Sequence, residues 1–331
     1  MDSSRIPLIF LICINLFSNI TSAEIERHLK NGKEVTQSKF IQNLMNQKEE
    51  KVNLAETAFA LSKEIDPSVN TKLDLETINQ IVKEVDKTAG TSNDPIVRIN
   101  TLNQVISRNM GLKYDFSDPT AQKSENNLLS LTLRTRKGSC LTMPLLYLAV
   151  SNKLNWPIYP VIAPNHLFLR YYSPPIRPIN IEVTSGGGSF SDESYIQKLN
   201  IKSQAIKNGV FMRNISKKEM VAVLLQFNSE FYFKERNHLK AFEYINAAIE
   251  LFPKNPHFLM QKSSMFRRLS NDFLQKHDLY GSSQLADQAQ NYGMQALELG
   301  YQKWDREQYL KQMAGFEKME KTIAESRNKL R

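Results

Sequence analysis

The sequence predicts an α+β protein with a helical N-terminal region, a central core that holds a short antiparallel sheet, and an α-helical C-terminal region. Apolar residues recur at helical intervals through both ends of the chain. Three short runs between these ends are rich in branched and aromatic residues, and they predict strands over 158–163, 166–172 and 178–184. A linker rich in Pro and Ser, 173–177, separates the last two runs and predicts a hairpin turn.

The first 23 residues have the pattern of a signal peptide. Arg5 precedes an apolar run from Ile6 to Phe17, and small residues lead to a cleavage site after Ala23. The run is shorter than the roughly 20 residues that span a bilayer. We therefore predict a signal peptide over 1–23 and export to the periplasm or a secreted location, with no stable membrane anchor after cleavage.

Export changes the meaning of the cysteine count. The chain has two cysteines, and Cys13 lies within the predicted signal peptide. The mature chain then retains Cys140 alone, which excludes an intramolecular disulfide. A single cysteine in an exported protein is a free thiol with a role, an intermolecular bridge or a small buried apolar residue.

The N-terminal region, 24–95, is predicted to be helical. One helix places five apolar residues on one face, with Asp74 as its expected cap: Leu75, Ile78, Ile81, Val82 and Val85. A second helix is expected to begin after Asp94 as N-cap, with Pro95 at its first position and Gly111 beyond its end.

The central core, 96–205, holds a cysteine at the predicted start of a helix. A thiolate is favoured by a helix N-terminus, by neighbouring cations and by an adjacent imidazole. Cys140 follows Arg136 and Lys137 and precedes an apolar helical stretch. Pro144 cannot donate to the Cys140 carbonyl, so we expect a loose first turn or a helix start near position 142.

Strand pairing gives this cysteine its expected partners. If the second and third predicted strands form a hairpin, opposed residues have a constant sum of residue numbers, which is 348 for His166 and Glu182. Opposed side chains lie about 5 Å apart at their Cβ atoms, close enough for a carboxylate to orient an imidazole. Asp192 and Glu193 are lesser candidates for this acid.

Each candidate also has a purely structural interpretation. Cys140 could be a buried apolar cysteine, His166 a hydrogen-bonded structural residue and Glu182 a solvated strand residue. We favour the functional interpretation because the three occupy mutually consistent places. The other histidines lack metal-ligand spacing, so we expect no metal and no cofactor. The net charge of +9 is spread over Lys-rich helices without interleaved aromatic residues, which argues against nucleic-acid binding.

The C-terminal region, 215–331, contains a repeat. Residues 222–255 place small and aromatic residues at the offsets of a 34-residue helix–turn–helix unit and resemble a tetratricopeptide repeat. A second copy from Pro256 would need an insertion of 14 residues to align its alanines. Two copies are fewer than usually stand alone, so we expect these helices to pack on the central core or on a further helix over 304–319.

Three sequence blocks together resemble the core of the SirB-type transglutaminase-like family. They are R-K-G-S-C-L-T-M-P-L-L-Y-L-A-V (136–150), P-N-H-L-F-L-R (164–170) and I-E-V-T-S-G-G (181–187). The resemblance covers about 50–200, and the tetratricopeptide-like tail suits it. It implies a transglutaminase-like (papain-like) α+β core in which Cys140 is the nucleophile, His166 the general base and acid, and Glu182 the orienting acid.

The chain departs from the family pattern at three positions. Many members carry proline at the place of Cys140, glycine at that of Asn165 and aspartate at that of Glu182. The resemblance implies an exported thiol enzyme that acts by acyl transfer on the amide or peptide bonds of a protein or peptide substrate, with the Cys140 N–H as the expected oxyanion donor. The alternative is a non-catalytic adaptor that keeps the fold and binds a protein partner through its tetratricopeptide-like helices.

Overall fold

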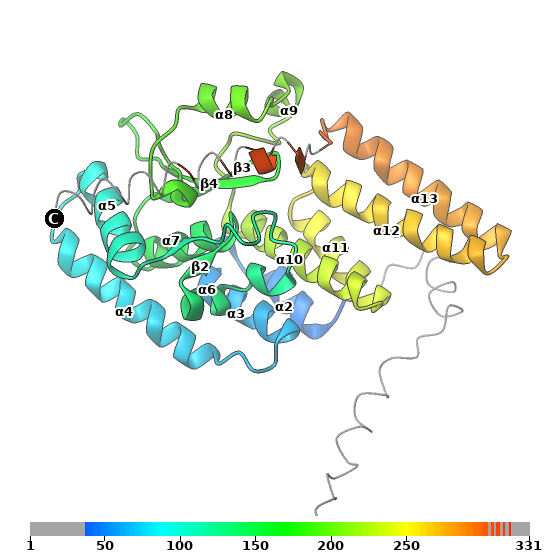
Figure 1. Cartoon of the computed structure of the whole chain (residues 1–331), viewed down its shortest axis with the longest axis horizontal. Coiled ribbons are helices and arrows are strands. Elements are labelled where there is room, and N and C mark those ends of the chain that lie inside the picture. The colour runs from blue at the N-terminus through cyan, green and yellow to red at the C-terminus, as the bar shows by residue number, and fades with distance from the viewer. Residues whose placement is uncertain (1–36, 304–305, 308, 312–313, 315–317, 319–331) are drawn as a thin grey trace, which may run out of the picture.

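The α+β fold class is confirmed by a computed structural model, which describes residues 37–303, 306–307, 309–311, 314 and 318 (Figure 1). The predicted signal peptide and Cys13 lie outside these residues, as does most of the helix expected over 304–319. Among the helices that the structure describes, none combines the length and the apolar character of a membrane span.

Helices occupy both ends of the described chain, and strands lie between them. The α-helices are α2 (Lys39–Asn46), α3 (Leu54–Ile65), α4 (Thr71–Ala89), α5 (Pro95–Leu102), α6 (Leu129–Thr135), α7 (Thr142–Lys153), α8 (Asp192–Lys198), α9 (Ser203–Lys207), α10 (Lys217–Lys234), α11 (His238–Leu251), α12 (Pro256–Gln275) and α13 (Leu279–Glu298). Short 3₁₀ segments are η1 (Glu49–Lys51), η3 (Ser124–Asn127) and η4 (Val183–Ser185), and a π-helix, η2 (Asn103–Asn109), continues α5. The strands are β1 (Lys113–Tyr114), β2 (Lys137–Gly138), β3 (Ile158–Ala163), β4 (His166–Tyr171) and β5 (Ile179–Ile181).

The N-terminal helices begin at side-chain caps. Asp94 accepts hydrogen bonds from the first amides of α5, as predicted. Helix α4, however, begins one turn earlier than expected, because the side chain of Asn70 accepts from the Leu73 N–H and satisfies the first free donors. Asp74 therefore lies inside the first turn of α4, where it is buried, and the prediction that it caps this helix is wrong.

Helix α7 is the central element of the core and is buried on nearly every side. The Ser139 side chain accepts hydrogen bonds from the Leu141 and Thr142 amides at 3.2 and 3.3 Å. The helix therefore begins at Thr142, as Pro144 in its first turn led us to expect. Cys140 remains in the loop between β2 and α7.

The sheet β3–β4–β5 is antiparallel, and the boundaries of β3 and β4 agree closely with the prediction, whereas β5 ends three residues earlier than expected. The register of the β4–β5 hairpin differs from the expected one. Leu169 pairs with Ile181, so opposed residues sum to 350 and Glu182 is not directly opposite His166. β5 leaves the ladder after Ile181 and turns into η4. A shift by two residues nevertheless keeps both side chains on the same face, because strand side chains alternate with a period of two.

The C-terminal region forms two helical hairpins, α10–α11 and α12–α13. The two turns repeat at an interval of 41 residues: Ser229 Oγ donates to the Ala241 carbonyl and Ser270 Oγ to the Ser282 carbonyl, both at 2.8 Å. A 34-residue unit with a 14-residue insertion would instead give an interval of 48 residues between the two copies. The predicted alignment of the second copy, which was based on its alanines, is therefore wrong. Helices α12 and α13 are longer than α10 and α11, and the two hairpins correspond at their turns rather than at these alanines.

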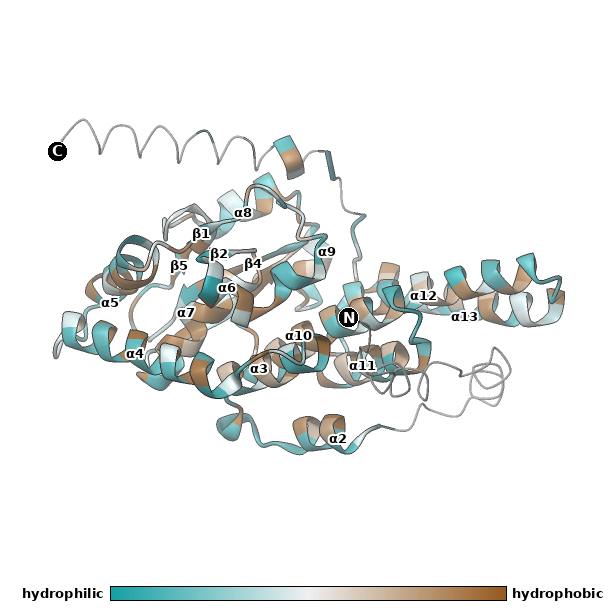
Figure 2. Ribbon diagram, turned by 60° about the horizontal axis from the view of Figure 1, so that its bottom comes forward, coloured by the Kyte–Doolittle hydropathy of each residue, from teal (hydrophilic) through white to brown (hydrophobic). Residues whose placement is uncertain are grey.

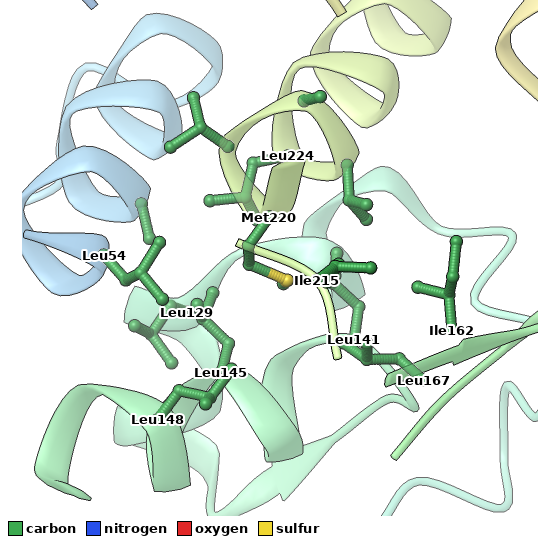
Figure 3. Packing of buried hydrophobic residues seen from close by; sticks show 14 of the residues in the cluster. Leu54, Leu129, Leu141, Leu145, Leu148, Ile162, Leu167, Ile215, Met220 and Leu224 are labelled. Carbon is green, nitrogen blue, oxygen red and sulfur yellow. The ribbon is translucent and has the colours of Figure 1, made fainter. Parts of the chain in front are cut away.

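The first hairpin packs on the rest of the protein, whereas the second projects from it (Figures 1 and 2). Met220 of α10 lies between Leu54 of α3 and Leu145 of α7 (Figure 3). Asn228 of α10 also donates to the Leu61 carbonyl of α3 at 3.0 Å. Packing on the central core was expected, but the additional contact with the N-terminal helices was not.

Candidate active site

Cys140 lies in a tight loop that leaves its backbone donor unused. It is half-buried and makes no disulfide. Ser139 Oγ accepts from the amides of Leu141 and Thr142. The Cys140 N–H, in contrast, has no acceptor within the described part of the chain. An unused N–H beside a thiol, at the start of a helix, is suited to stabilise an oxyanion.

The structure brings His166 and Glu182 together. His166 begins β4, Glu182 follows β5, and the imidazole Nε2 lies 2.6 Å from the carboxylate Oε2. Their side chains are 13% and 4% exposed. The Cys140 side chain also acts on the imidazole and raises the pKa of His166. Because Nε2 faces Glu182, Nδ1 is the ring nitrogen left for the thiol.

The pKa of His166 reflects its two partners. Burial lowers this pKa, but the charge of Glu182 and the hydrogen bonds with Cys140 and Glu182 outweigh burial and raise it to about 10. The imidazole is therefore held in its charged form near neutral pH. An imidazolium at this position favours a thiolate at Cys140.

Glu182 is a buried carboxylate with every oxygen bonded. Oε1 accepts from the Thr184 amide at 3.1 Å and from the Thr184 hydroxyl at 2.6 Å, while Oε2 accepts from Tyr195 at 2.8 Å as well as facing His166. Burial raises the pKa of Glu182, yet the His166 charge and these donors lower it overall. The carboxylate is thus fixed in position and ionised.

Thr184 and Tyr195 were not found by sequence reasoning. Tyr195 comes from α8 and stacks on Phe168, with ring centroids 4.0 Å apart and an interplanar angle of 8°. It also stacks on His166, with centroids 6.0 Å apart. Thr184 lies two residues after Glu182, a spacing at which a side-chain hydrogen bond to the carboxylate is common. No local sequence signal indicates that Tyr195 also binds Glu182.

The lesser candidates for the acid serve other roles. Asp192 binds Arg170 and Asn180, each at 2.6 Å, and ties α8 to the β4–β5 hairpin. Glu193 lies exposed and bonds within its own turn. Of the two cations that precede the thiol in the sequence, Arg136 donates to the Met110 carbonyl.

Asn165 explains one departure from the family pattern. Its φ of +53° lies in the left-handed region, at the turn between β3 and β4. Glycine adopts this region freely, and asparagine is the side chain that tolerates it best. The residue that precedes the histidine can therefore be either one.

The thiol and the imidazole open onto a cavity of about 250 Å³. Its wall combines the central core with the helical hairpins, since Phe227 of α10 and His257 of α12 line it together with Cys140 and His166. Tyr309, whose hydroxyl lies 3.1 Å from that of Tyr114, also lines it. No group of three or more potential metal ligands occurs among the described residues.

Comparison with known proteins agrees with this architecture. A UPF0162 protein from Buchnera aphidicola subsp. Baizongia pistaciae (strain Bp) is 23% identical over 237 residues, which cover 69% of this chain and 85% of that protein. No solved structure matches the chain. Residues 74–226 match the family model of the transglutaminase-like superfamily, and this range includes Cys140, His166 and Glu182. The chain therefore contains a transglutaminase-like superfamily domain at residues 74–226.

Proposed function

We propose that this protein is an exported thiol enzyme of the SirB-type, transglutaminase-like class, which transfers acyl groups from amide or peptide bonds. The observation that carries the proposal is the contact of a buried His166–Glu182 pair with the only cysteine outside the expected signal peptide, at the wall of one cavity. Orientation of an imidazole by a carboxylate, beside a thiol, is the arrangement that activates a nucleophile.

The reaction begins at the Cys140 sulfur. Because His166 is charged, the imidazolium already holds the proton, and the Cys140 thiolate forms a bond with the carbonyl carbon of the substrate while the Cys140 N–H stabilises the oxyanion. His166 then gives its proton to the amine as the C–N bond breaks, which leaves a thioester. Water or a second amine attacks the thioester and gives its proton to His166, the C–S bond breaks, and the thiolate–imidazolium pair is restored.

Glu182 positions the imidazole throughout this cycle. Its oxygens are bonded by Thr184 and Tyr195, so the carboxylate cannot rotate away when the charge on His166 changes. It stabilises the imidazolium that forms when the thiol ionises. Loss of this support should slow both the attack and the release of the amine.

The proposal is tested by the rate at which iodoacetamide alkylates Cys140 across pH. We expect alkylation of the wild type at pH 6–7 to be at least about tenfold faster than that of His166→Ala. His277→Asn is the matched control: this exposed histidine also has a positive φ, which asparagine tolerates. Equal rates in the wild type and in His166→Ala would overturn the catalytic role of the pair.

Export is part of the proposal and has its own test. A reporter that folds only outside the cytoplasm is fused after residue 23, and its activity is compared with that of a fusion whose apolar run is broken by two lysines. Activity in the first fusion alone supports export directed by the apolar run. Activity in neither fusion would contradict export.

The second candidate function is a protein-binding adaptor. It is favoured by the second hairpin, α12–α13, which carries exposed large apolar residues: Leu274, Leu279, Tyr280, Met294 and Leu297. Exposed apolar surface of this kind marks sites of association. Under this alternative, Cys140→Ala would leave the biological function of the protein unchanged.

A further inference from the structure

The cavity beside Cys140 has a second wall that the acyl-transfer chemistry does not use. Val223, Gln226 and Phe227 of α10 form one part of it, and Asn255 with His257 at the start of α12 forms another. The helical hairpins therefore shape the space into which the thiol opens. Because the C-terminal hairpins form part of the cavity wall, their side chains can determine which substrates reach the sulfur of Cys140.

The charges that line the cavity exclude one class of ligand. The chain has 43 Lys and Arg residues, yet none of them is among the described residues that line the cavity. Glu230 is the lining carboxylate, and Lys234 pairs with it at 3.0 Å. The charged ring of His166 also lines the cavity but is already paired with Glu182, so an anionic ligand would lose its hydration there without gaining an unpaired cation, and the cavity favours neutral groups.

Three polar atoms of residues that line the cavity are buried without a hydrogen-bond partner. They are Asn127 Oδ1, Asn165 Nδ2 and His257 Nε2. The Asn127 amide donates its Nδ2 to the Ala121 carbonyl, which fixes the orientation that leaves its oxygen unpaired. Burial lowers the pKa of His257 to about 4, so its ring is neutral near pH 7. Buried polar groups normally find partners, and an unpaired donor together with an unpaired acceptor matches a peptide amide.

The rest of the lining is apolar. Ile162, Leu167 and Phe211 contribute from the core, next to Val223 and Phe227 from the hairpin. Figure 3 shows Ile162 and Leu167 close to Leu141, which follows the nucleophile. At about 250 Å³, the cavity is slightly smaller than the roughly 300 Å³ at which small-molecule sites begin, so it suits a short segment of chain.

We propose that this cavity binds a neutral peptide segment with an aromatic or branched apolar side chain, whose main-chain amide pairs with Asn165, Asn127 and His257. The hairpin wall takes the side chain, and the amide is held beside the sulfur of Cys140. As a statement about the substrate, the proposal rests on the proposed function, but the binding preference can be measured without turnover.

The test compares two thiol reagents on the full chain: N-iodoacetyl-phenylalaninamide, which is neutral, and N-iodoacetyl-phenylalanine, which carries a carboxylate. In both, a C–S bond to Cys140 forms and iodide leaves. Each rate is divided by the rate of the same reagent with free cysteine, which cancels the intrinsic reactivity of the reagent, and the comparison of the two reagents on one protein cancels that of the thiol. We expect saturation with the neutral reagent and a normalised preference for it of at least about tenfold.

Two variants locate the preference. Asn165→Gly keeps the left-handed turn and removes the unpaired donor, and His257→Phe keeps the ring contacts with Phe211 and Tyr301 but removes Nε2. Each should lower the normalised preference about threefold or more, whereas Gln290→Ala, on the exposed side of α13, should not change it. A preference that is unaltered in both variants would overturn the assignment.

The outcomes separate this proposal from the proposed function. A thiol whose reactivity is independent of His166 contradicts the enzyme, while the normalised preference can still be measured. If Cys140 reacts only after unfolding, NMR line broadening of N-acetyl-phenylalaninamide and of N-acetyl-phenylalanine gives the same comparison without alkylation. Equal normalised rates, or equal broadening of the two ligands, would overturn the peptide subsite.

Discussion

Two charge pairs lie on one face of the same β4–β5 hairpin, and they differ in what surrounds them. His166–Glu182 and Arg170–Asp192 both have a nitrogen and an oxygen 2.6 Å apart, and the two cations are four residues apart on β4. The first pair has side chains that are 13% and 4% exposed and lies against a thiol. In the second, Asp192 is 42% exposed and joins α8 to the sheet.

A short charge pair therefore does not by itself mark a reactive site. Arg170 cannot release its proton, so its pair can only hold two elements together. His166 can give up its proton to a reacting group, and its carboxylate partner is shielded from water by Thr184 and Tyr195. The titratable cation, the burial of its acid and the adjacent sulfur make the difference between the two pairs.

The largest effect is expected from Glu182→Gln. The glutamine cannot accept from every donor that faces the carboxylate, and it leaves a buried imidazolium without its counter-charge. We expect a loss of roughly 3 kcal/mol in the free energy of unfolding and a drop of at least about tenfold in Cys140 alkylation at pH 7. Urea unfolding and alkylation kinetics measure the two quantities.

A pH dependence of stability should follow from His166. Its pKa is raised from about 6.5 in the unfolded chain to about 10, so the folded state binds a proton more tightly across that interval. The resulting stabilisation is fully present below pH 6.5 and is lost as pH rises through 10. The unfolding free energy of the wild type should decline between these pH values, and the decline should be smaller in His166→Gln. Parallel profiles for the two proteins would contradict the shift.

Tyr195→Phe should have a smaller effect. It removes one donor to Glu182 but keeps the ring that stacks on Phe168. Loss of one hydrogen bond to a charged group costs roughly 1.5 kcal/mol, and the alkylation rate should fall only a few-fold. A loss of reactivity as large as that of Glu182→Gln would mean that Tyr195 acts on the reaction more directly than as a support.

The smallest effect is expected from Asp192→Asn, the counterpart of Glu182→Gln in the second pair. The amide oxygen still accepts from Asn180 and Arg170, and water can replace what is lost because the residue is partly exposed. We expect a change of at most about 1 kcal/mol in unfolding free energy. Alkylation of Cys140 should equal that of the wild type, and a slower rate would show that the two pairs are coupled.

The sequence was informative where local rules apply. The boundaries of β3 and β4, the Asp94 cap and the start of α7 follow from residue patterns that span a few positions, and the structure agrees with them. The closeness of His166 and Glu182 was also predictable, because alternation along strands fixes the face of a side chain even when the register is wrong by two.

The rest depends on contacts between distant parts of the chain. Tyr195 reaches Glu182 only because α8 folds back over the sheet, and the turn that leads to it is not encoded by a periodic pattern. Val223 and His257 reach the cavity only once the hairpins have packed on the core. Asn70 and Asp74 lie one turn apart, and both are residue types that cap helices. The structure uses Asn70, so the residue type alone does not identify the cap.

The register of the β4–β5 hairpin has a consequence for how related chains diverge. The pleat returns a side chain to the same face every second residue, so the interval between the histidine and its acid can change by two without separating the pair. A change by one would turn the acid toward the opposite face. Among diverging relatives, shifts of the acid along β5 are therefore expected in even steps, whereas the connection between the two strands is free to vary in length, and a motif with a fixed interval would overlook functional members.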